Sequence, residues 1–287
     1  MSLEIIETIR AMREVVRETR RRGRTVGFVP TMGALHRGHA RLIEQCRTEA
    51  DLVVVSIFVN PTQFGPREDL GKYPRTLDSD REVCALAGTD RIFLPSVETM
   101  YPIASETMAF VEVPGLTDIL EGACRPGHFR GVATVVLKFF NIIEPDFAYF
   151  GAKDFQQQLV IKRMVADLDL AVEIRTVPTV RESDGLALSS RNRYLGAEER
   201  RAAAILSEAL RRAKASVFGG ERDANRVRQL LRETIGLEPL VILEYAEVAD
   251  AHSLERLDGL TPGRTAVGLL AARVGSTRLI DNETLTE

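Results

Sequence analysis

Over the first 180 residues, the spacing of apolar residues changes repeatedly between that of a helix and that of a strand. Apolar side chains recur every three or four positions from Leu3 to Val16, which predicts a helix that Gly23 ends. A short strand is predicted at 26–29, and the apolar run LVVVSIFV at 52–59 is typical of a strand buried on both faces of a parallel sheet. The same periodicities predict helices near 40–50, 76–87, 132–143 and 155–168, and strands at 91–94, 147–150 and 172–177.

The repeated order of strand, helix and strand predicts an α/β fold, with a Rossmann-like parallel sheet flanked by helices. Such sheets gather ligands at the carboxyl ends of their strands, and the conspicuous loops of this chain follow predicted strands. Beyond residue 180 the pattern changes to charged helices at 197–218 and 224–235, then strands at 241–248 and 265–270. We therefore expect two domains, residues 1–179 and a smaller α+β domain at 180–287, joined by a polar and flexible segment.

Composition excludes several classes of protein. Apolar residues make up 45% and charged residues 28%, as in ordinary globular proteins, and a net charge of -3 offers a nucleic acid no general attraction. Cys46, Cys84 and Cys124 are odd in number and never spaced as C-x-x-C, which argues against a disulfide framework or a zinc knuckle. No stretch approaches the ~18 apolar residues of a membrane span, and the charged N-terminus lacks a signal peptide. A cytoplasmic protein without a membrane partner is expected.

Two of the 4 histidines lie within PTMGALHRGH at 30–39, between the first predicted strand and its helix. The glycines are wrongly placed for a phosphate loop or a G-x-G-x-x-G fingerprint. His36 and His39 at a helix N-terminus would supply two hydrogen-bond donors beside the positive end of the helix dipole, which suits an anion. Alternatively, one histidine caps the helix and the other packs. A zinc site would need a third ligand, which nothing nearby supplies.

Two further loops carry polar side chains with less specific patterns. Asn60 and Gln63 follow the buried strand, and their amides can hydrogen-bond to a hydroxyl or a carboxylate of a ligand. The segment is equally typical of an ordinary proline turn. The glycine-rich segment at 122–131 carries Arg125 and His128. The segment is typical either of an anion-binding loop or of a surface loop that only connects two elements.

Two more segments suit phosphate binding. Lys153, one of few lysines, follows a predicted strand and is a mobile positive charge for phosphates, and Asp154 beside it suits a helix cap. The segment LSSRN at 188–192 offers two hydroxyls and the Arg191 guanidinium, which is typical either of a phosphate-closing loop or of a polar linker.

Strand, H-x-G-H loop, helix and a later Ser-Ser-Arg loop together resemble the superfamily of nucleotidyltransferases and class I aminoacyl-tRNA synthetases. The segments PTMGALHRGH, SIFVNPTQF, EGACRPGHFRGV, FGAKDFQQQ and VRESDGLALSSRNRYL narrow the likeness to the pantothenate synthetase family, the pantoate:beta-alanine ligases. They stand in that family's order from Pro30 to Leu195, and a weaker likeness continues at RLIDN, 278–282.

That resemblance implies an ATP-dependent ligase. ATP and pantoate would form pantoyl adenylate and pyrophosphate, and beta-alanine would then displace AMP to give pantothenate. Mg²⁺ would accompany ATP, with ligands that the sequence leaves unknown, and the enzyme would be a homodimer. The first domain would bind nucleotide and pantoate, and the smaller one would act as a lid.

The resemblance also implies roles for single residues. His39 occupies the position of a proton donor, and His36, Lys153 and Arg191 complete the predicted catalytic set. Gln63 and Gln157 match pantoate-binding positions, and Gln63 also borders the beta-alanine site. Asn60, Arg125 and His128 are further substrate-binding candidates. The predicted ATP contacts are Met32, Gly33, Ala34, Leu35, His36, Arg37, Gly38, His39, Gly151, Ala152, Lys153, Asp154, Val180, Leu188, Ser189, Ser190 and Arg191. Ala152 stands where the family commonly has a glutamate, and this difference affects only a peripheral ATP contact.

The residue types agree with this chemistry. The carboxylate of pantoate is ionised at neutral pH and needs no general base, so catalysis must overcome repulsion between anions. Cationic and hydrogen-bonding side chains reduce this repulsion. The main alternative is a nucleotidyltransferase acting on a phosphorylated small molecule. A tRNA synthetase fits less well because the second domain has no marked basic excess, and a nucleotide-binding regulator would not need both histidines, Lys153 and the Ser-Ser-Arg loop.

Overall fold

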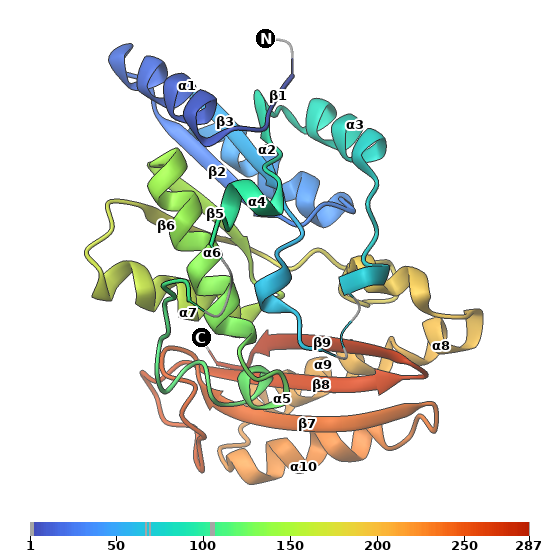
Figure 1. Cartoon of the computed structure of the whole chain (residues 1–287). Coiled ribbons are helices and arrows are strands. Elements are labelled where there is room, and N and C mark those ends of the chain that lie inside the picture. Colours follow the sequence, from blue (N-terminus) through green and yellow to red (C-terminus); the bar gives the residue numbers. More distant parts are fainter. Residues whose placement is uncertain (1–2, 67, 69, 104–106, 287) are drawn as a thin grey trace. The chain divides into compact units, whose positions relative to one another are not determined.

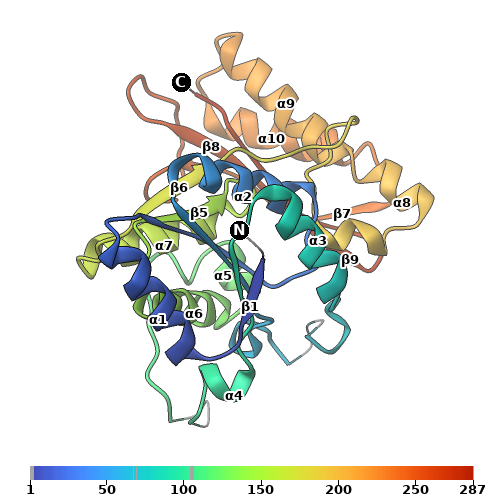
Figure 2. The ribbon, with the colours of Figure 1, turned by 90° about the horizontal axis from the view of Figure 1, so that it is seen from above.

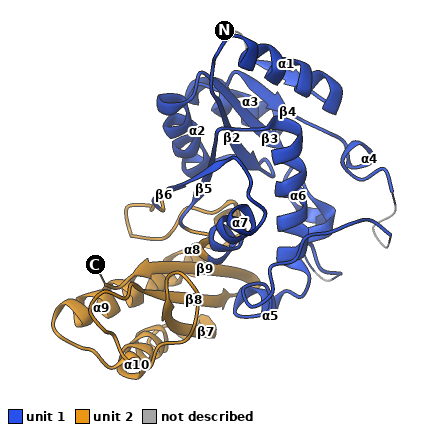
Figure 3. Cartoon of the chain, turned by 90° about the vertical axis from the view of Figure 1, so that its left-hand side faces the viewer, with its two compact units in different colours: residues 1–152, 156–178 blue, residues 153–155, 179–287 orange. Residues whose placement is uncertain are grey.

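The computed structural model describes residues 3–66, 68, 70–103 and 107–286. The chain divides into two compact units (Figure 3): Met1–Ala152 with Gln156–Pro178, and Lys153–Phe155 with Thr179–Glu287. The short turn at 153–155 therefore groups with the second unit although it lies between two elements of the first. No helix among the described residues is both long and apolar enough to cross a bilayer.

A six-stranded, all-parallel sheet forms the centre of the first unit (Figure 1), which confirms the predicted fold class. Its strands are β1 Glu4–Ile6, β2 Val26–Thr31, β3 Leu52–Ile57, β4 Arg91–Phe93, β5 Phe147–Gly151 and β6 Glu173–Val177, in the order β1-β4-β3-β2-β5-β6. From β2 the chain adds β3 and β4 on one side and then β5 and β6 on the other. The order thus reverses between β2 and β5, where ligand crevices form in sheets of this kind.

The helices in this part of the chain are α1 Ile9–Arg21, α2 Arg37–Glu49, α3 Leu77–Ala87, α4 Val97–Met100, α5 Glu121–Cys124, α6 His128–Ile143 and α7 Phe155–Asp167. Helices α1, α2 and α6 pack on the sheet, with α2 on the opposite face to α6. Helices α1 and α6 pack together, as do α2 and α3 (Figure 2). Because successive side chains of a strand point to opposite faces, Phe28 of β2 packs on Phe139 of α6, whereas Val29 joins the core with Ile43 of α2.

The predicted N-terminal helix is wrong over its first residues. Glu4–Ile6 forms β1, which pairs in parallel with β4 at the sheet edge, and the Thr8 side chain then caps α1 by accepting from the N–H of Ala11. A three-residue strand is too short to show its period, so Leu3 and Ile6 were absorbed into the helical pattern that follows. Helix α6 starts four residues before the predicted position, which brings His128 into its first turn.

The second unit is built on an antiparallel sheet of three strands, β7 Val241–Asp250, β8 Ala266–Val274 and β9 Thr277–Thr284. The sheet shares one hydrophobic core with α9 Ile205–Phe218 and α10 Ala224–Ile235, which confirms an α+β unit. The predicted helix at 197–218 is two helices, α8 Ala197–Ala202 and α9. Strand β9 was not predicted as a strand. The polar segment Arg181–Gly185, expected to be a flexible hinge, carries three ion-paired side chains: Arg181 pairs with Asp281, and Glu182 and Asp184 pair with Arg200.

Candidate active site

The two histidines after β2 cap their own helix. His36 is the N-cap of α2, and its Nδ1 accepts from the N–H of Gly38 at 3.1 Å, while His39 Nδ1 accepts from the N–H of His36 at 3.3 Å. The ring centroids lie 4.1 Å apart. Because each Nδ1 is an acceptor, the neutral ring carries its proton on Nε2. The two interpretations of the sequence therefore combine, since capping orients both rings at the positive end of the α2 dipole, where an anion is stabilised.

A buried carboxylate holds the loop between β2 and these histidines. Asp80 of α3 is 1% exposed, and it accepts from the N–H of Ala34 at 3.1 Å and of Leu35 at 2.7 Å. The loop needs such support because Gly33 and Ala34 both adopt positive φ, of 80° and 51°. Sequence reasoning missed Asp80, because an acid in the first turn of a predicted helix is most simply explained by the helix dipole.

The turn after β3 meets the loop after β2 through Gln63. Its side-chain amide donates to the sulfur of Met32 at 3.2 Å, and its Oε1 accepts from Asn60 Nδ2 at 3.1 Å. Asn60 is 1% exposed and also donates to the carbonyl of Gly131 at 3.2 Å. The two predicted amides thus lie together, with Asn60 orienting Gln63.

A chain of polar contacts ends on the backbone of Gln63. Arg125 Nε and Nη2 donate to the two oxygens of Glu68 at 2.8 and 2.5 Å, and Nη1 lies 3.1 Å from His128 Nε2. His128 Nδ1 lies 2.9 Å from the carbonyl oxygen of Gln63. Burial, and then the Arg125 charge, lower the pKa of His128 to about 4. The ring is therefore neutral at pH 7, with Nδ1 donating to Gln63 and Nε2 accepting from Arg125.

Gln156 of α7 hydrogen-bonds to the backbone of the segment 116–121, which precedes Arg125 in the sequence. Its Nε2 donates to the carbonyls of Leu116 and Ile119 at 2.7 and 2.8 Å, and its Oε1 accepts from the N–H of Glu121 at 3.0 Å. Its half-buried neighbour Gln157 is one of the two predicted pantoate ligands, with Gln63. Only the family resemblance singled out Gln157, and no local pattern in the sequence indicated the supporting role of Gln156.

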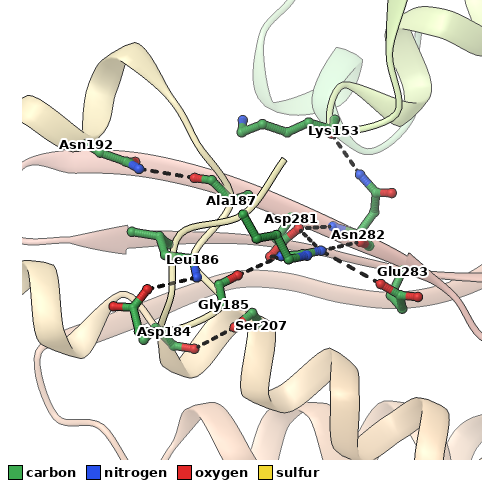
Figure 4. A network of polar contacts seen from close by, with 12 residues as sticks. Lys153, Asp184, Gly185, Leu186, Ala187, Asn192, Ser207, Asp281, Asn282 and Glu283 are labelled. Atoms are coloured by element: carbon green, nitrogen blue, oxygen red, sulfur yellow. Dashed lines mark hydrogen bonds and ion pairs between the residues drawn. The ribbon is translucent and has the colours of Figure 1, made fainter. Parts of the chain in front are cut away.

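Predicted ATP contacts in the second unit also lie together. The N–H of Leu188 donates to the carbonyl of Val180 at 2.9 Å, which brings the two ends of the 180–188 segment side by side. Ser189 Oγ then accepts from the N–H of Arg191 at 3.3 Å, at the start of a 3₁₀ helix over Ser190–Tyr194. Asn192 closes the segment by donating to the carbonyl of Ala187 at 3.1 Å (Figure 4).

The predicted site residues divide between the units. The first unit holds Met32, Gly33, Ala34, Leu35, His36, Arg37, Gly38, His39, Asn60, Gln63, Arg125, His128, Gly151, Ala152 and Gln157, and the second holds Lys153, Asp154, Val180, Leu188, Ser189, Ser190 and Arg191. Within the described ranges, no group of three or more His, Cys, Asp or Glu side chains is arranged to hold a metal ion.

The fold and the site define a class, a Rossmann-like α/β protein in which a helix N-terminus suited to an anion follows β2, beside the strand-order reversal. The family model for pantoate-beta-alanine ligase matches residues 4–284. A pantothenate synthetase of Moorella thermoacetica is 53% identical over 283 residues, 99% of each chain. The chain belongs to the pantoate-beta-alanine ligase family and is an enzyme of that ligase class.

Solved structures agree with this assignment. The crystal structure of pantothenate synthetase from Thermus thermophilus matches with a TM-score of 0.92 and 44% identity, covering 99% of this chain and 100% of that one. A pantoate-beta-alanine ligase from Francisella tularensis, complexed with beta-gamma ATP and beta-alanine, matches with a TM-score of 0.81 and 35% identity, covering 99% and 98%.

Proposed function

We propose that the protein condenses pantoate with beta-alanine in two steps, of which only the first consumes ATP. The pantoate carboxylate attacks the α-phosphorus of ATP, forming pantoyl adenylate and releasing pyrophosphate. The amine of beta-alanine then attacks the acyl carbon and displaces AMP. The strongest support is the full-length family match, together with the histidine pair at the N-terminus of α2.

The first step needs positive charge more than a base. His36, His39, Lys153 and Arg191 stabilise the phosphate charge that develops as pyrophosphate leaves, and His39, at the proton-donor position, donates its Nε2–H in a hydrogen bond to a phosphate oxygen. One well-placed donor of this kind is worth ~10²–10³ in rate. Backbone and side chains of 32–39, 151–154, Val180 and 188–191 contact ATP.

Pantoate binds between two amides, Gln63 and Gln157, and Gln63 also borders beta-alanine. Asn60, Arg125 and His128 belong to the same substrate end, where the contacts with Gln63 support the assignment. The attacking amine must be neutral, and the adenylate must be kept from water. The first unit binds nucleotide and pantoate, and the second acts as the lid that excludes water.

Mg²⁺ would be bound through the phosphates of ATP, where it would offset their negative charge. Such an ion is usually held by only one or two protein carboxylates besides phosphate oxygens and waters. Among the described residues, no group of three or more His, Cys, Asp or Glu side chains forms a dedicated site for it. The resemblance also supports a homodimer, and the three free thiols suit the reducing cytoplasm.

The test is a two-stage assay. With Mg-ATP and pantoate, the protein should release pyrophosphate, and beta-alanine should then release AMP and form pantothenate. Nucleotide retained in the final product would instead indicate a nucleotidyltransferase. ATP binding without pantoate-dependent pyrophosphate release would indicate a non-catalytic regulator.

A further inference from the structure

Two adjacent polar residues of β9, Asp281 and Asn282, have no part in the proposed chemistry. They lie in the RLIDN segment and are only 3% and 8% exposed. Buried polar side chains are costly unless they are hydrogen-bonded, so their partners indicate what they do. Figure 4 shows that those partners come from two segments far away in the sequence.

Asn282 holds the turn that carries Lys153. Its side-chain amide donates to the main-chain carbonyl of Lys153 at 2.7 Å, across 129 positions of sequence. This contact fixes the peptide after Lys153 without using the ammonium group. In Figure 4 the Lys153 side chain extends away from Asn282. The proposed phosphate ligand is thus anchored at its backbone, and its charged end is left for another contact.

Asp281 holds the segment that begins at Val180. Arg181 Nη1 and Nη2 donate to the two carboxylate oxygens of Asp281 at 2.6 and 3.0 Å. Arg181 also donates to the carbonyls of Gly185 at 3.1 Å and Asn282 at 3.2 Å. Burial alone would lower the pKa of Arg181, but its hydrogen bonds and the charge of Asp281 raise that pKa above its usual value. A paired, bidentate geometry of this kind fixes both position and orientation.

We infer that Asp281 and Asn282 are positioning residues of the ATP site. Side by side on one strand, they anchor the Lys153 turn and the Val180–Leu188 segment, and so set the spacing between two groups of proposed ATP contacts. The inference rests on the proposed function for the role of those contacts. It matters for rate because a misplacement of about 1 Å at a reacting centre can cost 10²-fold.

Asn282→Asp tests the anchor, because it nearly keeps the size of the side chain but removes the N–H that donates to Lys153. We expect kcat/KM for ATP in pantoate-dependent pyrophosphate release to fall about tenfold to a hundredfold. In a Lys153→Ala background the same change should cost less than about twofold, because the two residues act as a unit. An equal loss in both backgrounds, or no loss in either, would overturn the inference.

A matched control separates positioning from folding. Thr234 of α10 is 2% exposed, and its hydroxyl donates to the carbonyl of Leu230 at 2.7 Å, a contact within its own helix. Thr234→Ala should lower the melting temperature and leave kcat/KM unchanged. If Asn282→Asp does not fold, Asn282→Ser replaces it, since a serine hydroxyl is too short to reach the Lys153 carbonyl.

The same variants distinguish failure of the inference from failure of the proposed function. Wild-type protein without pyrophosphate release contradicts the proposed function only. Calorimetric titration with Mg-ATP still reports on the anchor, because Asn282→Asp should weaken ATP binding about tenfold in the wild-type background and not in Lys153→Ala. Unchanged ATP affinity in an active enzyme with unchanged kcat/KM contradicts the inference alone.

Discussion

At the residue scale, the site depends on buried polar groups that hold backbone in place. Asp80 supports the loop before the histidines, Asn60 orients Gln63, and His128 holds the carbonyl of Gln63. All three contacts lie in the interior, so neither partner can turn to water for a replacement hydrogen bond. Removing one partner leaves the other buried and unpaired, which costs more than the hydrogen bond itself contributes.

Asp80→Ala should destabilise the protein and loosen the loop after β2. It leaves the N–H groups of Ala34 and Leu35 buried without their acceptor, at about 1–3 kcal/mol each. We expect the free energy of unfolding in urea to fall by about 2–6 kcal/mol. Asp80→Asn keeps one acceptor and should cost less. Equal stability of wild type and Asp80→Ala would contradict the anchoring role.

His128 should make stability fall as pH falls. Its folded pKa of about 4 lies below the ordinary 6.5, so between these values the unfolded chain binds the proton and the folded chain does not. Unfolding therefore becomes more favourable through this window as the pH drops. The same loss should be absent from His128→Asn, whose side-chain amide nitrogen takes the place of Nδ1 and keeps the donor to the carbonyl of Gln63. Between pH 7 and 5, wild type should lose about 2 kcal/mol more than this variant in urea unfolding. Parallel losses would show that His128 is not buried in its neutral form.

At the scale of elements, the site is set by where helices and turns approach one another. Helix α6 contacts the turn after β3 at Gly131, whose carbonyl accepts from the side chain of Asn60. A Cβ built on Gly131 would lie 2.4 Å from the carbonyl oxygen of Thr62, closer than real contacts allow. The glycine is thus required by a close approach of two elements.

Gly131→Ala should push α6 away from the turn that carries Gln63. In an exposed helix this change stabilises by about 1 kcal/mol, whereas here it should destabilise and raise KM for pantoate. Gly71→Ala is the matched control, because nothing lies within 4 Å of a Cβ there, and it should leave both quantities unchanged. Urea unfolding and pyrophosphate-release kinetics on both variants measure the difference. A Gly131→Ala enzyme with wild-type KM would show that the contact is relieved without moving Gln63.

At the scale of the whole molecule, the chain forms two units that each have a core. The second unit buries side chains of α9, α10 and all three strands in one cluster, including Leu206, Leu231 and Leu270. Units with their own hydrophobic core commonly fold alone.

The fragment at 179–287 should therefore unfold cooperatively by itself. Thermal denaturation followed by circular dichroism should show one sigmoidal transition for the fragment. Its melting temperature should be insensitive to Mg-ATP, because the fragment lacks Lys153 and every proposed contact of the first unit. A gradual, non-cooperative loss of signal would show that the second core depends on the rest of the chain.

Sequence alone predicted much of this protein, and the reason is locality. The period of apolar residues identified the parallel α/β unit, and the spacing of His36 and His39 placed both at a helix start, because strands, helices and caps are decided by neighbours a few positions away. The family resemblance was equally readable, since its motifs are continuous segments.

Tertiary structure decided what supports those motifs. Asp80 and Leu35 are 45 positions apart, Arg125 and Glu68 are 57, and Asn282 and Lys153 are 129. The strand β1 is likewise recognisable only from its pairing with β4, some 87 positions later. Contacts at such separations leave no periodicity in the chain. They exist only because the burial of apolar faces brings distant segments together, and the buried polar groups must then find partners there.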